Sequence, residues 1–221
     1  MVLDPKIFGE INSDIANLMS DPAFLYRIKT ELDQTIVGED QNKLLLYLIC
    51  SSSYTDFNLS AVVTGSSSSG KSWLKNNVLK YFANVQRFTR ITAAAPDRLG
   101  SSLDKKILDI EELRGAEAAQ SSLRLMISEG NLRLLTTTVD DETGKLATTT
   151  IDTLGRPTFI TTATSAEIDN ELLNRLFIIS IDESREQTKK IIKFEAQKYK
   201  ILGFNGETEK PSDLYAEPFV S

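Results

Sequence analysis

The sequence predicts an α/β fold with a mainly parallel sheet, and two observations carry this prediction. First, runs of apolar and β-branched residues alternate along the chain with helix-like runs, which is the pattern of a parallel sheet. Second, the stretch "TGSSSSGKSW" contains the pattern G-x-x-x-x-G-K-S between a strand-like run, "NLSAVV", and a helix-like run, "SWLKNNVLKYF". A strand, a glycine-bracketed loop and a helix are the context that a phosphate-binding loop requires.

The spacing within this loop predicts nucleotide binding. Gly65 and Gly70 let the backbone form a cradle of N–H groups, and the helix that begins near Lys71 adds its partial positive N-terminus. Lys71 is placed to reach the β- and γ-phosphates, and the Ser72 hydroxyl is placed to ligate Mg²⁺. The alternative, a serine-rich linker with a chance G-K-S, accounts for neither flank. We expect ATP and Mg²⁺ as ligands, with the nucleotide bound by Gly65, Ser66, Ser67, Ser68, Ser69, Gly70, Lys71, Ser72 and Trp73.

Composition narrows the chemistry. The 221 residues are 41% apolar and 25% charged, as in ordinary globular proteins. There is no histidine, which excludes Ser-His-Asp and Cys-His nucleophile systems and every histidine-ligated metal site. One cysteine, no signal-like N-terminus and no apolar run of membrane length predict a cytoplasmic protein with no membrane contact. Because the net charge is −6, any contact with nucleic acid must be local.

The other elements are expected in order along the chain. Residues 1–34 are expected to be helical, with Ser20 as an N-cap, and a second helix is expected over 39–49 after the break at Gly38. Beyond the phosphate-binding unit we expect strands over 87–96 and 104–113, a helix over 116–130, a hairpin around 140–144, a strand over 156–164, a helix feeding a last strand over 170–182, and a final helix over 183–201. The polar remainder is expected to be a linker or tail.

A phosphate-binding loop needs an acidic partner on a neighbouring strand, and "KILDIEEL" offers three carboxylates. Strand alternation puts Asp109 and Glu111 on one face and Glu112 on the other. Acids at the C-terminal end of a buried parallel strand indicate a site, so we assign Glu111 to the Mg²⁺ shell and Glu112 to polarising the attacking water. Asp109 is the reserve metal ligand, because aspartate is the usual residue there. The alternative is a solvated acidic strand end.

From about Thr35 to Asp182 the chain resembles an AAA+ ATPase core. The resemblance is to the branch of the minichromosome maintenance helicases and of the helicase domains in mobile-element and phage primase-helicases. The matching segments are, in order, "IVGEDQNKLLLYLI", "GSSSSGKS", "ILDIEEL", "LRLLTTTVDDETGKLATTTI", "FITTAT" and "LLNRLF". The resemblance implies a P-loop NTPase with a three-layer αβα sandwich and a parallel five-stranded sheet. It implies an N-terminal helical segment over 1–34, a core over 35–182 with a hairpin insert at about 131–151, and a partial helical lid over 183–221.

The resemblance also implies roles for individual residues. Ile36, Val37 and Gly38 would line the adenine pocket, Thr164 would be the polar sensor residue, and Arg175 would be the arginine finger. The usual sensor is asparagine, so this chain departs from the pattern at Thr164. The implied assembly is a homo-oligomeric ring that couples ATP hydrolysis to translocation on DNA, or to its unwinding, in the replication of a mobile element or virus. A primase domain or subunit is the implied further partner.

The hairpin is the expected DNA contact, through Arg133 and Lys145, although the acidic run 140–142 at the same tip opposes it. Two other functions stay open. The sequence pI of about 4.9 favours a protein-remodelling AAA+ ATPase, whereas the absence of an aromatic hairpin tip disfavours it. A monomeric P-loop kinase is the third reading. Arg175 distinguishes it, because a kinase needs no residue from a neighbouring subunit.

Overall fold

The computed structural model describes residues 17, 20–92, 95, 96, 99, 103–113, 117–139, 146–164 and 168–203. The chain divides into two compact units, Met1–Ile181 and Asp182–Ser221. The first unit holds all the described strands. The described part of the second unit contains one long helix, α7 (Arg185–Gly203).

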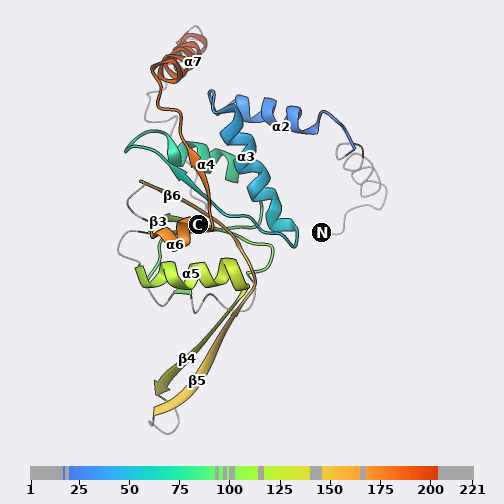
Figure 1. Cartoon of the computed structure of the whole chain (residues 1–221). Coiled ribbons are helices and arrows are strands. Elements are labelled where there is room, and N and C mark those ends of the chain that lie inside the picture. Colours follow the sequence, from blue (N-terminus) through green and yellow to red (C-terminus); the bar gives the residue numbers. More distant parts are fainter. Residues whose placement is uncertain are drawn as a thin grey trace. The chain divides into compact units, whose positions relative to one another are not determined.

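The first unit is built on a five-stranded parallel sheet (Figure 1). The strand order is β2-β3-β6-β1-β7, and each of the four neighbouring pairs is parallel. The α/β fold with a parallel five-stranded sheet is therefore confirmed. The strands are β1 (Ala61–Thr64), β2 (Val85–Arg90), β3 (Ile107–Glu112), β6 (Thr158–Ala163) and β7 (Phe177–Ser180).

Helices cover both faces of this sheet because its central strands carry apolar side chains in both directions. In β3, Ile107 packs in a cluster with residues of α3 and α4, whereas Leu108 and Ile110 pack in a second cluster with residues of α5 and α6. This alternation is the period of two that a strand imposes. The helices are α3 (Asp40–Ser51) and α4 (Lys71–Leu79) on one face, and α5 (Glu117–Glu129) and α6 (Asn170–Leu173) on the other.

Helix α2 does not begin directly after Ser20, as the sequence predicted. Helix α2 spans Phe24–Asp33, and its N-cap is Ala23, which makes no side-chain capping bond. The expectation of Ser20 as the N-cap is wrong, because the Asp21 carboxylate accepts the amide of Ala23 (2.8 Å) and holds this stretch in a turn. The expected helix over residues 1–16 lies outside the described part of the chain. A short 3-10 helix, Ser52–Tyr54, follows α3.

The inserted hairpin forms a sheet of its own (Figure 1). Strands β4 (Asn131–Val139) and β5 (Leu146–Leu154) pair antiparallel, and β5 continues past the predicted end at 151. At the base, Gly155 has φ +114, and a Cβ there would lie 2.5 Å from the Asp104 amide nitrogen. Glycine therefore permits the close approach that fixes the hairpin base against the segment leading into β3. The tip, residues 140–145, lies outside the described residues.

Among the described residues, no helix is both long enough and apolar enough to span a lipid bilayer.

Candidate nucleotide-binding site

The loop between β1 and α4 has the backbone of a phosphate cradle. Gly70, the residue before α4, has φ +96, and Ser68 has φ +62. Both values lie in the left-handed region, where a side chain costs energy and where successive N–H groups converge on one point. Glycine at position 70 is thus required by the local conformation. Lys71 is the first residue of α4, so the positive end of the helix opens on the same point.

Side chains in this loop leave room and polar groups for an anion. A cavity of about 300 Å³ is lined by the residues from Ser68 to Trp73. The Ser69 hydroxyl is buried beside it and has no hydrogen-bond partner among the residues that the structure describes. The Lys71 ammonium folds over the loop and donates to the carbonyl oxygens of Gly65 (3.0 Å) and Ser66. An anion entering the cradle would offer both groups a stronger acceptor, so the residues present fit a phosphate group.

The segment expected to line the adenine pocket lies beside this loop. The Trp73 indole nitrogen donates to the carbonyl oxygen of Thr35 (3.0 Å), which joins the first turn of α4 to the start of that segment. Ile36 is buried in the core, and Gly38 has φ +64. Lys43, fully buried on α3, donates to the Gly38 carbonyl (2.7 Å) and the Ile36 carbonyl (3.3 Å). Its ion pairs with Asp33 and Asp40 satisfy its charge. Residues 35–38 are thereby held in one conformation.

All three carboxylates lie within β3, as the sequence predicted. Asp109 faces α4, where it pairs with Lys75. Glu111 lies two residues further along the strand, so it projects toward the same face of the sheet, the face that α4 covers. Glu111 is exposed, as is Ser72. A hydroxyl and a carboxylate are ligands that suit Mg²⁺, so this donor set fits the ion. In the described residues there is no cluster of three or more acidic or cysteine side chains that could hold a metal by themselves.

Glu112 projects from the opposite face and is held by β2. Arg90 lies directly beside it in the parallel register, and the Arg90 Nε donates to Glu112 Oε2 at 2.7 Å. This ion pair raises the pKa of Arg90. Sequence reasoning missed Arg90, because β2 and β3 are paired only through the fold.

Asp109 is engaged in a buried ion pair. Its side chain is fully buried, contacts the buried Lys75 ammonium of α4, and accepts from the Arg87 Nε of β2 at 3.0 Å. The three residues therefore tie α4, the helix after the phosphate loop, to β2 and β3. Sequence reasoning missed Lys75 as well. The available signal was its position between Leu74 and Val78 on a helix that must bury one face.

Thr164 follows the last residue of β6 and lies level with the phosphate loop. Thr64 of β1 is in register with Ala163 of β6, so Gly65 and Thr164 leave the sheet side by side. Because β6 lies between β1 and β3, Thr164 stands between the cradle and the acidic residues. The structure thus brings Thr164 together with Lys71 and the carboxylates at the C-terminal ends of the parallel strands.

Arg175 lies near the N-terminal ends of the strands, at the opposite end of the sheet from the phosphate loop. It precedes β7, whose first residue, Phe177, is in register with Ala61 at the start of β1, whereas the phosphate loop follows the end of β1. With a rise of about 3.3 Å per residue, the length of β1 alone separates the two levels by about 10 Å. The exposed Arg175 guanidinium donates to the Ser128 hydroxyl (2.6 Å) and to the Glu171 carbonyl.

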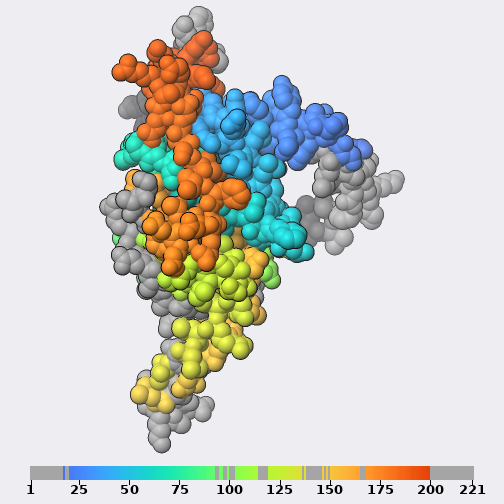
Figure 2. Space-filling model, in the orientation of Figure 1, coloured from blue at the N-terminus to red at the C-terminus, as the bar shows by residue number. Residues whose placement is uncertain are grey.

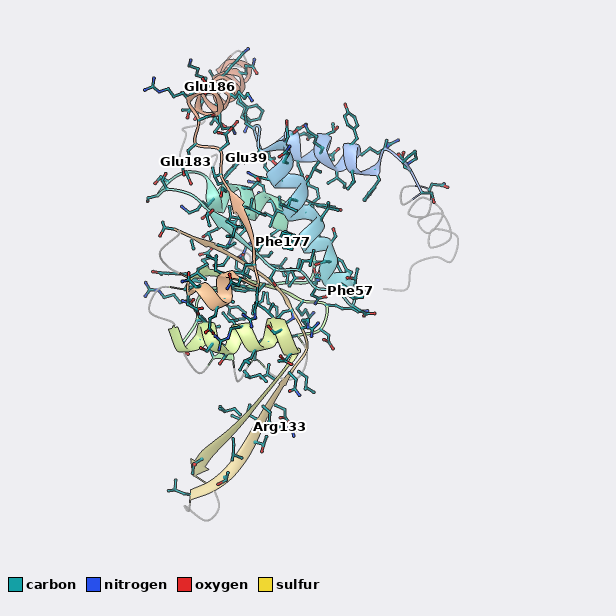
Figure 3. All side chains as sticks on the ribbon, viewed as in Figure 1. Glu39, Phe57, Arg133, Phe177, Glu183 and Glu186 are labelled. Atoms are coloured by element: carbon teal, nitrogen blue, oxygen red, sulfur yellow. The ribbon has the colours of Figure 1, made fainter. Side chains whose placement is uncertain are left out.

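Of the two hairpin residues expected to contact DNA, Arg133 lies in the described part of the chain. The Arg133 guanidinium makes two hydrogen bonds to the Asp152 carboxylate, at 2.7 and 3.1 Å, across the hairpin (Figure 3). This pair lowers the pKa of Asp152 and neutralises the single cation of β4. Lys145 lies outside the described residues.

Comparison with known proteins agrees with the geometry of the phosphate loop. The model of the family described as the MTBMA_p00010 P-loop domain matches residues 11–213 of the 221. The chain belongs to this P-loop domain family. Membership and the phosphate cradle together make the protein a nucleotide-binding P-loop NTPase domain. No curated protein matches the sequence.

Proposed function

We propose that this P-loop domain is an ATP-hydrolysing motor of the AAA+ type that assembles into a homo-oligomeric ring and translocates on DNA or unwinds it. Service in the replication of a mobile element or virus, with a primase domain or subunit as partner, is part of the proposal and rests on the sequence resemblance alone.

The observation that carries the ring is the separation between Arg175 and the phosphate loop of the same chain. Arg175 begins at the level where β1 starts, and the loop begins where β1 ends. A guanidinium at that place cannot reach the nucleotide bound to its own subunit without unfolding the start of β7. It is exposed, and its bonds to Ser128 and Glu171 hold it at the surface. An adjacent subunit can therefore receive it.

The other roles follow from the position of each residue near the C-terminal ends of the strands, where the phosphate loop lies. Lys71 would neutralise the β- and γ-phosphates, Ser72 and Glu111 would hold Mg²⁺, and Glu112 would take a proton from the attacking water. Thr164 would orient that water from its position between the cradle and β3. An ion held by Ser72 and Glu111 would supply positive charge next to the phosphates. Asp109 is left out of this set, because Lys75 and Arg87 already engage it.

A second candidate is a protein-remodelling ATPase of the same type. One observation favours it. The strands β4 and β5 carry one cation and one acid between them, and these neutralise each other, so the described hairpin offers no free charge to a phosphate backbone. The two candidates share the ring and the catalytic residues and differ only in the polymer that they move.

A mixing experiment tests the ring. Arg175→Ala subunits keep an intact phosphate loop, and Lys71→Ala subunits keep an intact finger, so each can supply what the other lacks. We expect each variant alone to be inactive and the mixture to recover part of the hydrolysis. Turnover per subunit should also rise steeply with protein concentration. Recovery in no mixture, with turnover independent of concentration, would overturn the ring and favour a monomeric enzyme.

A further inference from the structure

Helix α7 concentrates positive charge in an acidic chain. Its 19 residues, "REQTKKIIKFEAQKYKILG", contain six cationic side chains and two acidic ones. The whole chain has a net charge of −6, so the rest of it is more acidic than that figure. Nucleic-acid contact by such a chain must be confined to a local cationic surface.

Most cations of the first unit are already neutralised. Eight of its described Lys and Arg residues lie in ion pairs, including Arg133 on the hairpin and Arg90, which pairs with Glu112 on β3. The hairpin projects from the rest of the first unit (Figure 2). It presents hydroxyls and apolar side chains, such as the exposed Leu135 and Leu146. In its described residues the hairpin therefore lacks the charge that a polyanion requires.

Helix α7 has the opposite character. Arg185, Lys189 and Lys193 are spaced four residues apart, which places them in one stripe along the helix, about 12 Å long at 1.5 Å per residue. All three are exposed, and none makes an ion pair with a described residue. Lys190 lies beside the stripe. Hydrogen bonds from Ser184 lower the pKa of Asp182 at the start of this unit, and the charge of Lys190 adds a smaller contribution. Glu186 is the acidic residue on the flank of the stripe (Figure 3).

Two apolar side chains of the helix lie away from this stripe. Ile191 and Phe194 lie on the side of the helix away from Arg185 and Lys189, as their positions in the 3.6-residue turn require. Lys198 stands over the Phe194 ring at 4.6 Å and pairs with Glu195 (3.6 Å), so it belongs to that other side. The helix thus has one face on which three cations, without an ion pair among the described residues, lie beside the exposed Ile192.

We propose that the stripe of Arg185, Lys189 and Lys193 on α7 binds the phosphodiester backbone of a single-stranded nucleic acid. Three cations in a row, with no ion pair in the described part of the chain, suit the evenly spaced phosphates of one strand and read no bases. The proposal rests on the nucleic-acid motor proposed above and moves the backbone contact from the hairpin to α7. DNA and RNA share this chemistry, so the experiment compares both.

The experiment measures fluorescence anisotropy of labelled (dT)20 and (rU)20 with the full chain over a range of salt concentrations. The variant is Arg185→Gln/Lys189→Gln/Lys193→Gln. A control, Arg27→Gln/Lys80→Gln/Lys105→Gln, changes the net charge equally at exposed positions of the first unit. We expect the α7 variant to bind at least ~10-fold more weakly at low salt and to flatten the slope of log K against log[salt] by about two. The control should bind like the wild type. Basal ATP hydrolysis should be unchanged in both.

Three outcomes count against the proposal, each in a different way. If the wild type binds (dT)20 or (rU)20 and the α7 variant keeps its affinity and slope, the stripe is not the contact, although the motor can stand. If the wild type hydrolyses ATP but binds neither polymer, the nucleic-acid assignment of the motor fails as well. If the variant loses self-association, measured by light scattering, while keeping nucleic-acid binding, the stripe docks on an acidic surface of a second copy instead.

Discussion

Arg90 and Glu112 stand side by side at the C-terminal ends of two neighbouring parallel strands, with the guanidinium Nε 2.7 Å from the carboxylate Oε2. The Arg90 side chain is largely exposed and the Glu112 side chain is 40% exposed, so water and ions screen the pair and its contribution to stability is small. Its consequence concerns reactivity. Arg90 occupies one oxygen of the carboxylate, so in the proposed mechanism Glu112 would exchange Arg90 for water before accepting a proton.

The first prediction concerns this carboxylate. Glu112→Gln should bind ATP with near-normal affinity but hydrolyse it at least ~10²-fold more slowly, the scale of a lost general base. Steady-state phosphate release and equilibrium binding of ATP measure the two quantities separately. Asp109→Asn is the informative comparison. If that variant shows selective loss of hydrolysis and Glu112→Gln does not, the roles assigned along β3 are wrong.

The second prediction concerns Lys71. Lys71→Ala should abolish hydrolysis and largely abolish ATP binding, because the cradle loses the charge that meets the β- and γ-phosphates. Trp73 is the single tryptophan of the chain and lines the same cavity, so its fluorescence reports binding directly. Lys80→Ala, at the other end of α4, is the matched control and should titrate like the wild type. An unchanged ATP response in Lys71→Ala would remove the nucleotide site from this loop.

The sequence predicted the parts of the fold and of the site that are encoded locally. The phosphate loop was predicted correctly because its spacing, its glycines and its two flanks lie within some 25 residues of each other along the chain. The alternation of Asp109, Glu111 and Glu112 was predicted because a strand has a fixed period of two.

Relations between distant segments escaped prediction. Arg90 meets Glu112 only because β2 and β3 become neighbours in the folded sheet. Lys75 was missed because a helical lysine is ordinarily exposed, and only the buried Asp109 across the interface explains its place. The Ser20 cap failed for a local reason, since the neighbouring Asp21 competes more effectively for the backbone amides.

The third prediction concerns Cys50, the single cysteine. It lies on α3 and is buried in the core cluster that α3 and α4 form with the sheet. Burial, and to a smaller extent the nearby negative charge of Asp109, raises the pKa of its thiol well above the ordinary range. Because the thiolate is the reactive form, the native protein should react with a thiol reagent such as DTNB only through unfolding or local opening. Full reaction is expected in denaturant. Rapid stoichiometric reaction of the native protein would show that Cys50 is not in this core.

The last prediction concerns the ion pair of Lys75 and Asp109. Each side chain is almost completely buried, so removing Asp109 leaves the Lys75 charge in the core, whereas removing Lys75 leaves Asp109 with Arg87 as its remaining partner. We expect Lys75→Met and Asp109→Asn each to lower the free energy of unfolding, by up to about 3–5 kcal/mol, the scale of a broken buried ion pair. Urea unfolding followed by Trp73 fluorescence measures the change.

The double variant separates charge from packing. Lys75→Met/Asp109→Leu removes both charges and fills similar volume, so it should recover most of the lost stability, as paired replacements of buried ions do. Its nucleotide hydrolysis should stay below wild type, because the pair also fixes α4, which carries Lys71, against β3, which carries Glu112. Arg27→Gln, which breaks the exposed pair with Asp21, is the control and should cost no more than about 1 kcal/mol. If Lys75→Met costs as little as Arg27→Gln, then Lys75 reaches solvent in solution, and the buried pair does not link the two catalytic elements.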